Sequence, residues 1–128
     1  MQGLHLTADL HGCRCAPHWL TDADRLGAWC REAVLAAGLQ PVAALFHRFE
    51  ATGPGPAGVT ATVLLAESHV CVHTWPELRA VTLDVYVCNF GADHGAQAQQ
   101  LLQSLLALFD AQQVQRQTLR RGSATASD

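Results

Sequence analysis

Hydrophobic and polar residues alternate along several stretches of the chain, which is typical of strands with one buried face. Near the start, Leu4, Leu6 and Ala8 alternate with polar neighbours. A longer stretch around residue 85 alternates Val or Leu with polar residues in the same way. The pattern predicts strands at residues 4–8, 41–49, 59–66 and 81–88, with an edge strand at 114–119.

Two other stretches carry hydrophobic residues at helical spacing. Their hydrophobic positions are Leu26, Trp29, Cys30, Ala33, Val34 and Ala37 in the first stretch, and Leu101, Leu102, Leu105, Leu106 and Phe109 in the second. Thr21, with Asp24 three positions later, resembles a capping box and predicts the start of the first helix. Gly38 predicts its end. We therefore expect two amphipathic helices.

The centre of the chain combines a loop with a strand of reactive side chains. Residues 51–58 contain three glycines and two prolines, which predicts a loop. Further on, His69, Cys71 and His73 alternate with valines. Because successive side chains of a strand point to opposite faces, these three should share one face.

The order of elements is strand, helix, strand, a hairpin-rich centre, helix and strand, which indicates an α+β fold. We expect a two-layer structure in which an antiparallel sheet carries both helices on one face. The other face needs a cover, and a second copy would supply it by forming an αββα sandwich. We therefore expect a homodimer or a higher homo-oligomer. One domain is predicted over residues 1–121, with a disordered tail at 122–128.

The amino-acid composition and net charge disfavour some classes of function. The chain has 128 residues and a mass of 13.7 kDa, with 49% hydrophobic and 15% charged residues, as expected for one globular domain. Eight arginines and 11 acidic residues give a net charge of -3, which disfavours nucleic-acid binding. Without a long apolar stretch or a signal-like N-terminus, a cytoplasmic protein with no membrane partner is expected. Five cysteines, an odd number, favour reduced thiols.

The chain contains no lysine. It therefore cannot hold pyridoxal phosphate, or a carbonyl substrate, as a lysine Schiff base. Any chemistry of that kind must use another carbonyl group.

Residues 67–77, with Asp84 and Cys88, hold the densest group of reactive side chains in the chain. Each of them alone has an ordinary structural explanation, such as a turn serine or a packing thiol. Together they resemble the S-adenosylmethionine decarboxylase proenzyme family in its short bacterial and archaeal form. The resemblance covers residues 3–119, and its motifs are Glu67-Ser68-His69, His73-Thr74-Trp75-Pro76-Glu77, Asp84, Cys88, Phe46-His47-Arg48-Phe49, His5-Leu6 and Cys13.

The resemblance implies that the chain cleaves itself between Glu67 and Ser68, giving residues 1–67 as the β chain and 68–128 as the α chain. The Ser68 hydroxyl would attack the Glu67 carbonyl. Elimination and loss of ammonia would then leave a pyruvoyl group at the new N-terminus. This group is the family's cofactor, and its ketone takes the place of pyridoxal phosphate.

The resemblance also assigns roles to individual side chains. His73 would be the processing acid and base, and Thr60 would supply a hydroxyl that aids processing. Cys88 would donate a proton during decarboxylation. Glu77 would hold the ribose hydroxyls of S-adenosylmethionine and Phe49 would stack on adenine, although Phe49 could equally belong to the core. No metal is implied, and the product would be the aminopropyl donor for spermidine biosynthesis.

One segment departs from the family pattern. Leu78-Arg79-Ala80 stands where Tyr-Gly-Tyr is usual, so aromatic surface near the site is reduced. Relatives that decarboxylate L-ornithine or L-arginine keep the self-processing core and lose residues around the nucleoside. Such an amino-acid decarboxylase is therefore the alternative, with Arg79 or Glu77 meeting the amino acid.

Three further hypotheses come from other classes of protein. A structural zinc site would use His11, Cys13, Cys15 and His18. Four ligands crowded into one loop fit such a site poorly. An inactive partner or regulatory homologue is a second possibility, which the retained Ser68 and Cys88 disfavour. A thiol hydrolase built on Cys71 and His73 is a third, without an evident orienting residue.

Overall fold

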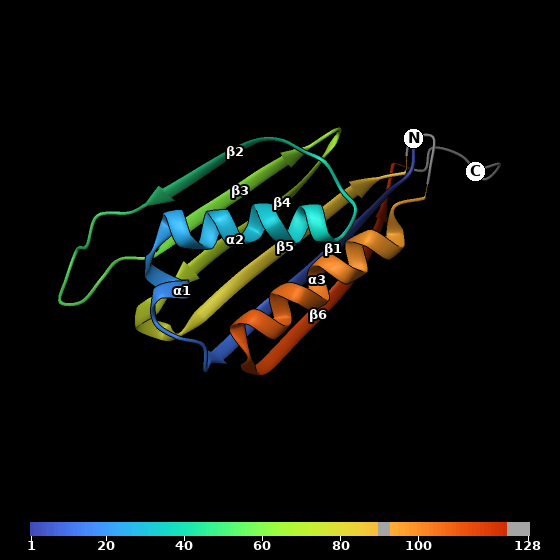
Figure 1. Cartoon of the computed structure of the whole chain (residues 1–128). Coiled ribbons are helices and arrows are strands. Elements are labelled where there is room, and N and C mark those ends of the chain that lie inside the picture. Colours follow the sequence, from blue (N-terminus) through green and yellow to red (C-terminus); the bar gives the residue numbers. More distant parts are fainter. Residues whose placement is uncertain (90–92, 123–128) are drawn as a thin grey trace.

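The computed structural model describes residues 1–89 and 93–122 (Figure 1). Residues 123–128, which make up most of the predicted disordered tail, lie outside the described residues. The strands are β1 (Gly3–Cys13), β2 (Pro41–Arg48), β3 (Val59–Leu65), β4 (Ser68–Trp75), β5 (Ala80–Cys88) and β6 (Ala111–Arg121). The helices are α1 (His18–Thr21), α2 (Ala23–Ala36) and α3 (Gly95–Phe109), and a 3-10 turn, η1 (Pro76–Leu78), precedes β5.

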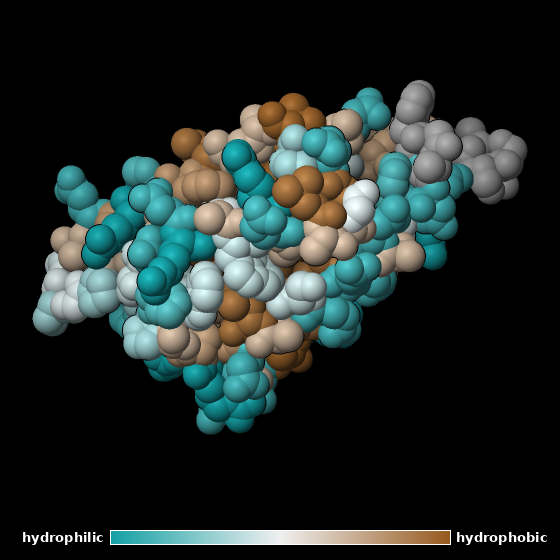
Figure 2. Space-filling model, in the orientation of Figure 1, coloured by the Kyte–Doolittle hydropathy of each residue, from teal (hydrophilic) through white to brown (hydrophobic). Residues whose placement is uncertain are grey.

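The strands form one antiparallel sheet in the order β2-β3-β4-β5-β1-β6. Helix α2 packs across β2 and β3, and α3 packs across β5 and β1, so both helices cover the same face (Figure 1). The predicted α+β class, an antiparallel sheet with two helices on one face, is confirmed. The predicted edge strand is also present as the longer β6. Seen from the helix side, polar and hydrophobic residues are interspersed on the surface (Figure 2).

The core lies between the sheet and the two helices. Along β5, every second residue from Val81 to Val87 is buried, as the alternation predicts. The helices contribute Leu26, Leu101 and Phe109, each fully buried. Burying one such large side chain contributes about 1.5–3 kcal/mol, so these contacts fix the helices on the sheet.

Thr74 is a buried polar residue that anchors the end of β4. Its hydroxyl donates a 2.7 Å hydrogen bond to the Leu20 carbonyl oxygen and accepts one of 2.9 Å from the amide of Val59. Gly58 packs against the Thr74 carbonyl so closely that a Cβ there would collide with it. These contacts hold the end of the 51–58 loop against β4.

The first long helix has a different cap from the one that the sequence predicted. Asp22 is the N-cap of α2, and its carboxylate accepts a 3.1 Å hydrogen bond from the amide of Arg25. Thr21 instead ends α1, and its hydroxyl donates to the Pro17 carbonyl. The predicted capping box at Thr21 was wrong because α1 keeps Thr21 inside a helical turn. Gly38, with a φ of 83°, lies just past the end of α2 as predicted.

The sheet face opposite the helices is called the open face below. It is lined by alternate residues of each strand, among them His5, Leu45, Thr60, Thr62, Leu64, His69, Cys71, His73, Trp75, Asp84, Tyr86 and Leu119. The prediction that His69, Cys71 and His73 share one face is therefore confirmed. Large hydrophobic side chains also lie exposed on this face, at Leu45, Leu64, Trp75 and Leu119.

Candidate active site

A tight turn at Ala66 and Glu67 joins β3 to β4, because Leu65 pairs directly with Ser68. Glu67 is exposed and has a φ of 57°, in the left-handed region that disfavours residues with a Cβ. This conformation costs a non-glycine residue on the order of 1–2 kcal/mol. The peptide bond between Glu67 and Ser68 therefore follows directly on a strained residue.

Ser68 and Cys88 meet at this end of the sheet. The backbone amide of Cys88 donates a 2.9 Å hydrogen bond to Ser68 Oγ. The contact forms because β4 and β5 are neighbours, with His69 opposite Tyr86. Cys88 is only 7% exposed, so its place at the end of β5 is a covered one. The structure thus brings together two of the residues that the sequence singled out.

His94 is a neighbour of this pair that the sequence analysis missed. A cavity of about 190 Å³ lies beside Ser68, and Val87 and His94 are among its lining residues. His94 Nδ1 lies 3.1 Å from the Cys88 carbonyl oxygen. The only signal in the sequence was a histidine directly before a helical pattern, where many ordinary residues also occur.

A second cluster lies on the open face, where β3 pairs with β4. Thr60 is opposite His73 and Thr62 is opposite Cys71. Thr60 Oγ1 lies 2.7 Å from His73 Nδ1, as close as a strong hydrogen bond requires. Cys71 Sγ lies 3.3 Å from His73 Nε2 and also 3.3 Å from Thr62 Oγ1. The structure therefore brings Thr60 and His73 together.

The pairing of Cys71 with His73 does not make an activated thiol. Burial raises the pKa of the Cys71 thiol above its ordinary value. A reactive cysteine needs the opposite shift, because the thiolate is the nucleophile. The raised pKa of Cys71 therefore does not favour the thiol-hydrolase hypothesis.

His73 and Ser68, by contrast, are not brought together within one chain. They stand five residues apart on β4. An extended strand of that length spans about 16 Å. Because the separation is an odd number of residues, their side chains also leave the strand on opposite sides. In a single sheet, His73 therefore cannot reach the bond that it was predicted to help cleave.

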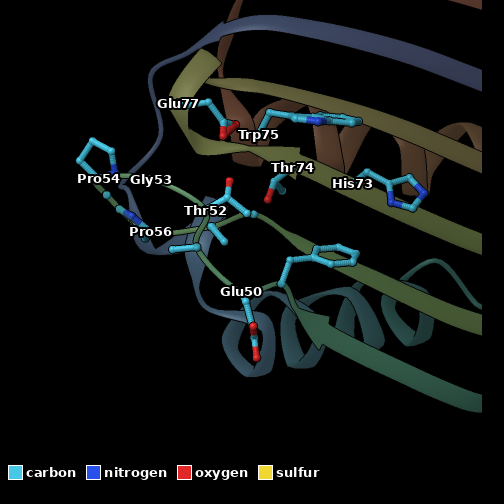
Figure 3. A pocket seen from close by; sticks show the side chains of 14 residues that line it. Glu50, Thr52, Gly53, Pro54, Pro56, His73, Thr74, Trp75 and Glu77 are labelled. Carbon is cyan, nitrogen blue, oxygen red and sulfur yellow. The ribbon is translucent and has the colours of Figure 1, made fainter.

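A larger pocket, of about 540 Å³, lies at the His73 end of the sheet (Figure 3). The 51–58 loop forms one side and the end of β4 forms the other, with Trp75 and Glu77 on the strand side (Figure 3). Phe49 also lines it and is 51% exposed, which excludes the interpretation of Phe49 as a core residue. Both predicted substrate-binding residues thus share one pocket with His73.

Arg79 is engaged by the backbone of a neighbouring segment. Its guanidinium donates to the carbonyl oxygens of Cys13 and Cys15, at 2.8 Å in the second case. Its φ of 46° is left-handed, a conformation that glycine adopts without strain. This explains why glycine suits the middle of the Tyr-Gly-Tyr pattern. A role for Arg79 in binding an amino-acid substrate loses support because two of its five N–H donors hold the guanidinium against the backbone of Cys13 and Cys15.

The geometry of the described residues gives no support to the zinc hypothesis. Among residues 1–89 and 93–122, no three His, Cys, Asp or Glu side chains converge as metal ligands. Cys13 is buried, and burial raises the pKa of its thiol to about 11. A protonated, buried thiol is a poor zinc ligand, since zinc binds the thiolate.

Asp84, another residue of the motif, lies on the open face between the two clusters. His5 Nε2 is 2.9 Å from Asp84 Oδ1, which links two residues that match the family pattern. His69 lies nearby and packs against Tyr86. Burial, with a further contribution from His5, lowers the pKa of His69.

Comparison with known proteins decides the family. The model of the S-adenosylmethionine decarboxylase family matches residues 4–122. The chain belongs to the S-adenosylmethionine decarboxylase family. The adenosylmethionine decarboxylase of Aquifex aeolicus VF5, known from a crystal structure, has the same fold with a TM-score of 0.81 and 28% sequence identity, over 97% of this chain and 93% of that chain.

Curated relatives in the S-adenosylmethionine decarboxylase family carry the name proenzyme. The S-adenosylmethionine decarboxylase proenzyme of Pyrococcus abyssi is 33% identical over 120 residues, which is 94% of this chain and 78% of that protein. The proenzyme of Syntrophomonas wolfei is 37% identical over 87 residues, which is 68% of this chain. The matched region spans 64% of the Syntrophomonas protein and 60% of a relative from Hydrogenobaculum. No helix within the described residues is long and apolar enough to span a bilayer.

Proposed function

We propose that this chain is the precursor of a pyruvoyl-dependent S-adenosylmethionine decarboxylase that cleaves itself between Glu67 and Ser68. The observation that carries the proposal is the position of the Ser68 hydroxyl. It is held by the amide of Cys88 directly after Glu67, whose left-handed backbone is strained. Membership of the family and the absence of lysine support the same conclusion.

Self-cleavage begins when Ser68 Oγ attacks the carbonyl carbon of Glu67. The Ser68 amide nitrogen leaves as an amine, and an ester replaces the peptide bond. Removal of the Ser68 Cα proton then breaks the ester bond, which gives a Glu67 carboxylate and a dehydroalanine at position 68. Addition of water and loss of ammonia leave the pyruvoyl group. Breaking the chain after Glu67 frees this residue from its left-handed conformation, which favours cleavage.

Within one chain, the two groups expected to aid processing, His73 and Thr60, lie at the other end of β4 from Ser68. We place His73 and Thr60 of a second copy at the Ser68 end. The open faces of two copies would pack together with their β4 strands antiparallel, so the partner's His73 lies near the turn that holds the Glu67–Ser68 bond. The exposed hydrophobic residues of the open face, Leu45, Leu64, Trp75 and Leu119, support such a cover. The expected αββα sandwich and homo-oligomer are part of this proposal.

The same arrangement would complete the substrate site. The pyruvoyl group, once formed, supplies an electron-withdrawing carbonyl that binds the substrate amine and lets carbon dioxide leave. Cys88 stands beside it and donates the proton that replaces the carboxylate. The pocket that contains Glu77 and Phe49 would come from the partner, with Glu77 on the ribose hydroxyls and Phe49 on the adenine.

An amino-acid substrate such as L-ornithine or L-arginine is the alternative for the same cofactor. The open 540 Å³ pocket with an exposed Phe49 favours a nucleoside. The product would then be the aminopropyl donor for spermidine biosynthesis. A cytoplasmic location remains a prediction.

Intact-mass measurement of the denatured protein tests self-cleavage. We expect two fragments, residues 1–67 and residues 68–128, the second with a pyruvoyl group at its N-terminus. The Ser68→Ala variant should remain whole. A wild-type protein that stays a single chain under assay conditions would contradict the proposal.

Release of carbon dioxide tests the substrate. The cleaved protein should release it from S-adenosylmethionine and not from ornithine, arginine or lysine. Release from ornithine or arginine alone would establish the alternative. If the cleaved protein released carbon dioxide from none of the four substrates, it would be an inactive partner or regulatory homologue.

A further inference from the structure

We propose that Cys71 is a positioning residue for self-cleavage, because its thiol selects which ring nitrogen of His73 carries the proton. This inference rests on the proposed function. It extends the processing machinery to a residue that neither the motif nor the comparisons assign.

The geometry is a continuous row of four side chains on the open face. The row runs from Thr62 Oγ1 to Cys71 Sγ, at 3.3 Å, and from Cys71 Sγ to His73 Nε2, also at 3.3 Å. It ends at Thr60 Oγ1, which lies 2.7 Å from His73 Nδ1. The register of β3 and β4 sets this row, because Thr62 lies opposite Cys71 and Thr60 lies opposite His73.

The row has one preferred direction. A neutral imidazole has one donor nitrogen and one acceptor nitrogen. When the group at position 71 donates to Nε2, that nitrogen carries no proton, and the ring proton belongs on Nδ1, donated to Thr60. Nε2 then accepts the S–H of Cys71, and Thr62 donates its own O–H to the sulfur.

The environment of Cys71 keeps its proton in place. Burial raises the pKa of the thiol, and the carboxylate of Asp84, which is opposite Cys71 on β5, acts in the same direction. The thiol therefore remains an S–H donor near neutral pH. A thiolate would reverse the row, since it could only accept a proton from Nε2.

The consequence appears at Thr60. When the Thr60 oxygen accepts from His73, its own O–H is directed away from the ring and is available to a reacting group. That is the arrangement required of a hydroxyl that donates to the developing oxyanion during the attack of Ser68. Cys71 thus acts through His73 on the Thr60 hydroxyl, and it keeps Nε2 unprotonated, so this nitrogen can take up a proton during processing once the weak S–H contact opens.

The rate of self-cleavage of the full-length precursor, followed by mass from about pH 5 to pH 9, tests this role. Cys71→Ser keeps a donor at the same place and should cleave at close to the wild-type rate. Cys71→Ala removes the donor and should cleave about tenfold more slowly, with a shifted pH profile. Thr62→Val should have a smaller effect in the same direction, and Cys15→Ala, outside the row, should have none. Equal rates and equal pH profiles for Cys71→Ala and Cys71→Ser would overturn the inference.

The tautomer of His73 gives a readout that does not depend on cleavage. In the uncleavable Ser68→Ala precursor, nitrogen-15 NMR should show the proton on Nδ1 of His73. Adding Cys71→Ala should give a mixture of tautomers, and adding Cys71→Ser should not. An unchanged tautomer in the Ala variant would refute the role of Cys71. Failure of the wild-type chain to cleave would instead refute the proposed function, while the NMR result would still decide the tautomer.

Discussion

The Ser68 hydroxyl accepts its 2.9 Å hydrogen bond from the main chain of Cys88 and not from the thiol. The contact therefore does not depend on the thiol and should survive Cys88→Ala. It also separates two proposed tasks of this residue. The amide of Cys88 orients Ser68 before cleavage, and the thiol supplies a proton after it.

This separation predicts the behaviour of Cys88→Ala. Self-cleavage should proceed at close to the wild-type rate, because the amide donor remains. Decarboxylation should fall by about 100-fold or more, as expected for the loss of a general acid. Fragment masses and carbon dioxide release from one preparation measure the two effects. Loss of both together would show that the thiol also serves processing, and retention of both would remove Cys88 from turnover.

The distance between Ser68 and His73 along β4 predicts that two inactive precursors rescue each other. A His73→Ala chain keeps its Ser68, and a Ser68→Ala chain keeps its His73. If His73 acts on the partner's Ser68, mixing the two should restore cleavage of the His73→Ala chain only. The masses of the two chains distinguish them. Each variant incubated alone is the control, and a mixture that stays uncleaved after subunit exchange would place the processing site within one chain.

The left-handed backbone of Arg79 predicts an unusual order of stabilities. Arg79→Ala loses the bonds to Cys13 and Cys15 and keeps the strain, whereas Arg79→Gly loses the bonds and relieves the strain. The Gly variant should therefore be more stable than the Ala variant by about 1 kcal/mol. Urea unfolding of both in the Ser68→Ala precursor gives the difference.

The matched control for Arg79 is an exposed helical position. At Glu32 on α2, Ala should be more stable than Gly, the usual order in helices. If Ala were also the more stable residue at position 79, the backbone there would not be strained.

The lowered pKa of His69 predicts how stability depends on pH. Burial lowers this pKa below the ordinary 6.5, so the unfolded chain takes up a proton at a higher pH than the folded chain does. The free energy of unfolding should therefore fall as the pH drops from about 6.5, until the folded state is also protonated. Urea unfolding of the Ser68→Ala precursor between about pH 5 and pH 8 measures this slope.

Substitution of His69 isolates its contribution to that slope. His69→Gln should flatten the pH dependence, whereas His11→Gln, at an exposed position, should leave it unchanged. A slope that is the same with and without His69 would assign the pH dependence to other groups.

Much of the local structure was predictable because it depends on near neighbours in the chain. Alternation alone placed His69, Cys71 and His73 on one face, and helical spacing located both long helices. The start of α2 was missed because α1, a turn too short to show a periodicity, moved the cap from Thr21 to Asp22.

The sequence by itself determined the fold class and the family motif, since both are written in residue types and their spacing. Only the tertiary structure decided which of those residues meet. Strand register placed Thr60 and Cys71 within hydrogen-bond distance of the two ring nitrogens of His73. It also placed the Ser68 hydroxyl where it accepts a hydrogen bond from the amide of Cys88. The rigid length of β4 held His73 away from Ser68, because a strand cannot fold back on itself. For that reason Ser68 lies far from His73, five residues along the chain, and contacts Cys88, twenty residues along the chain.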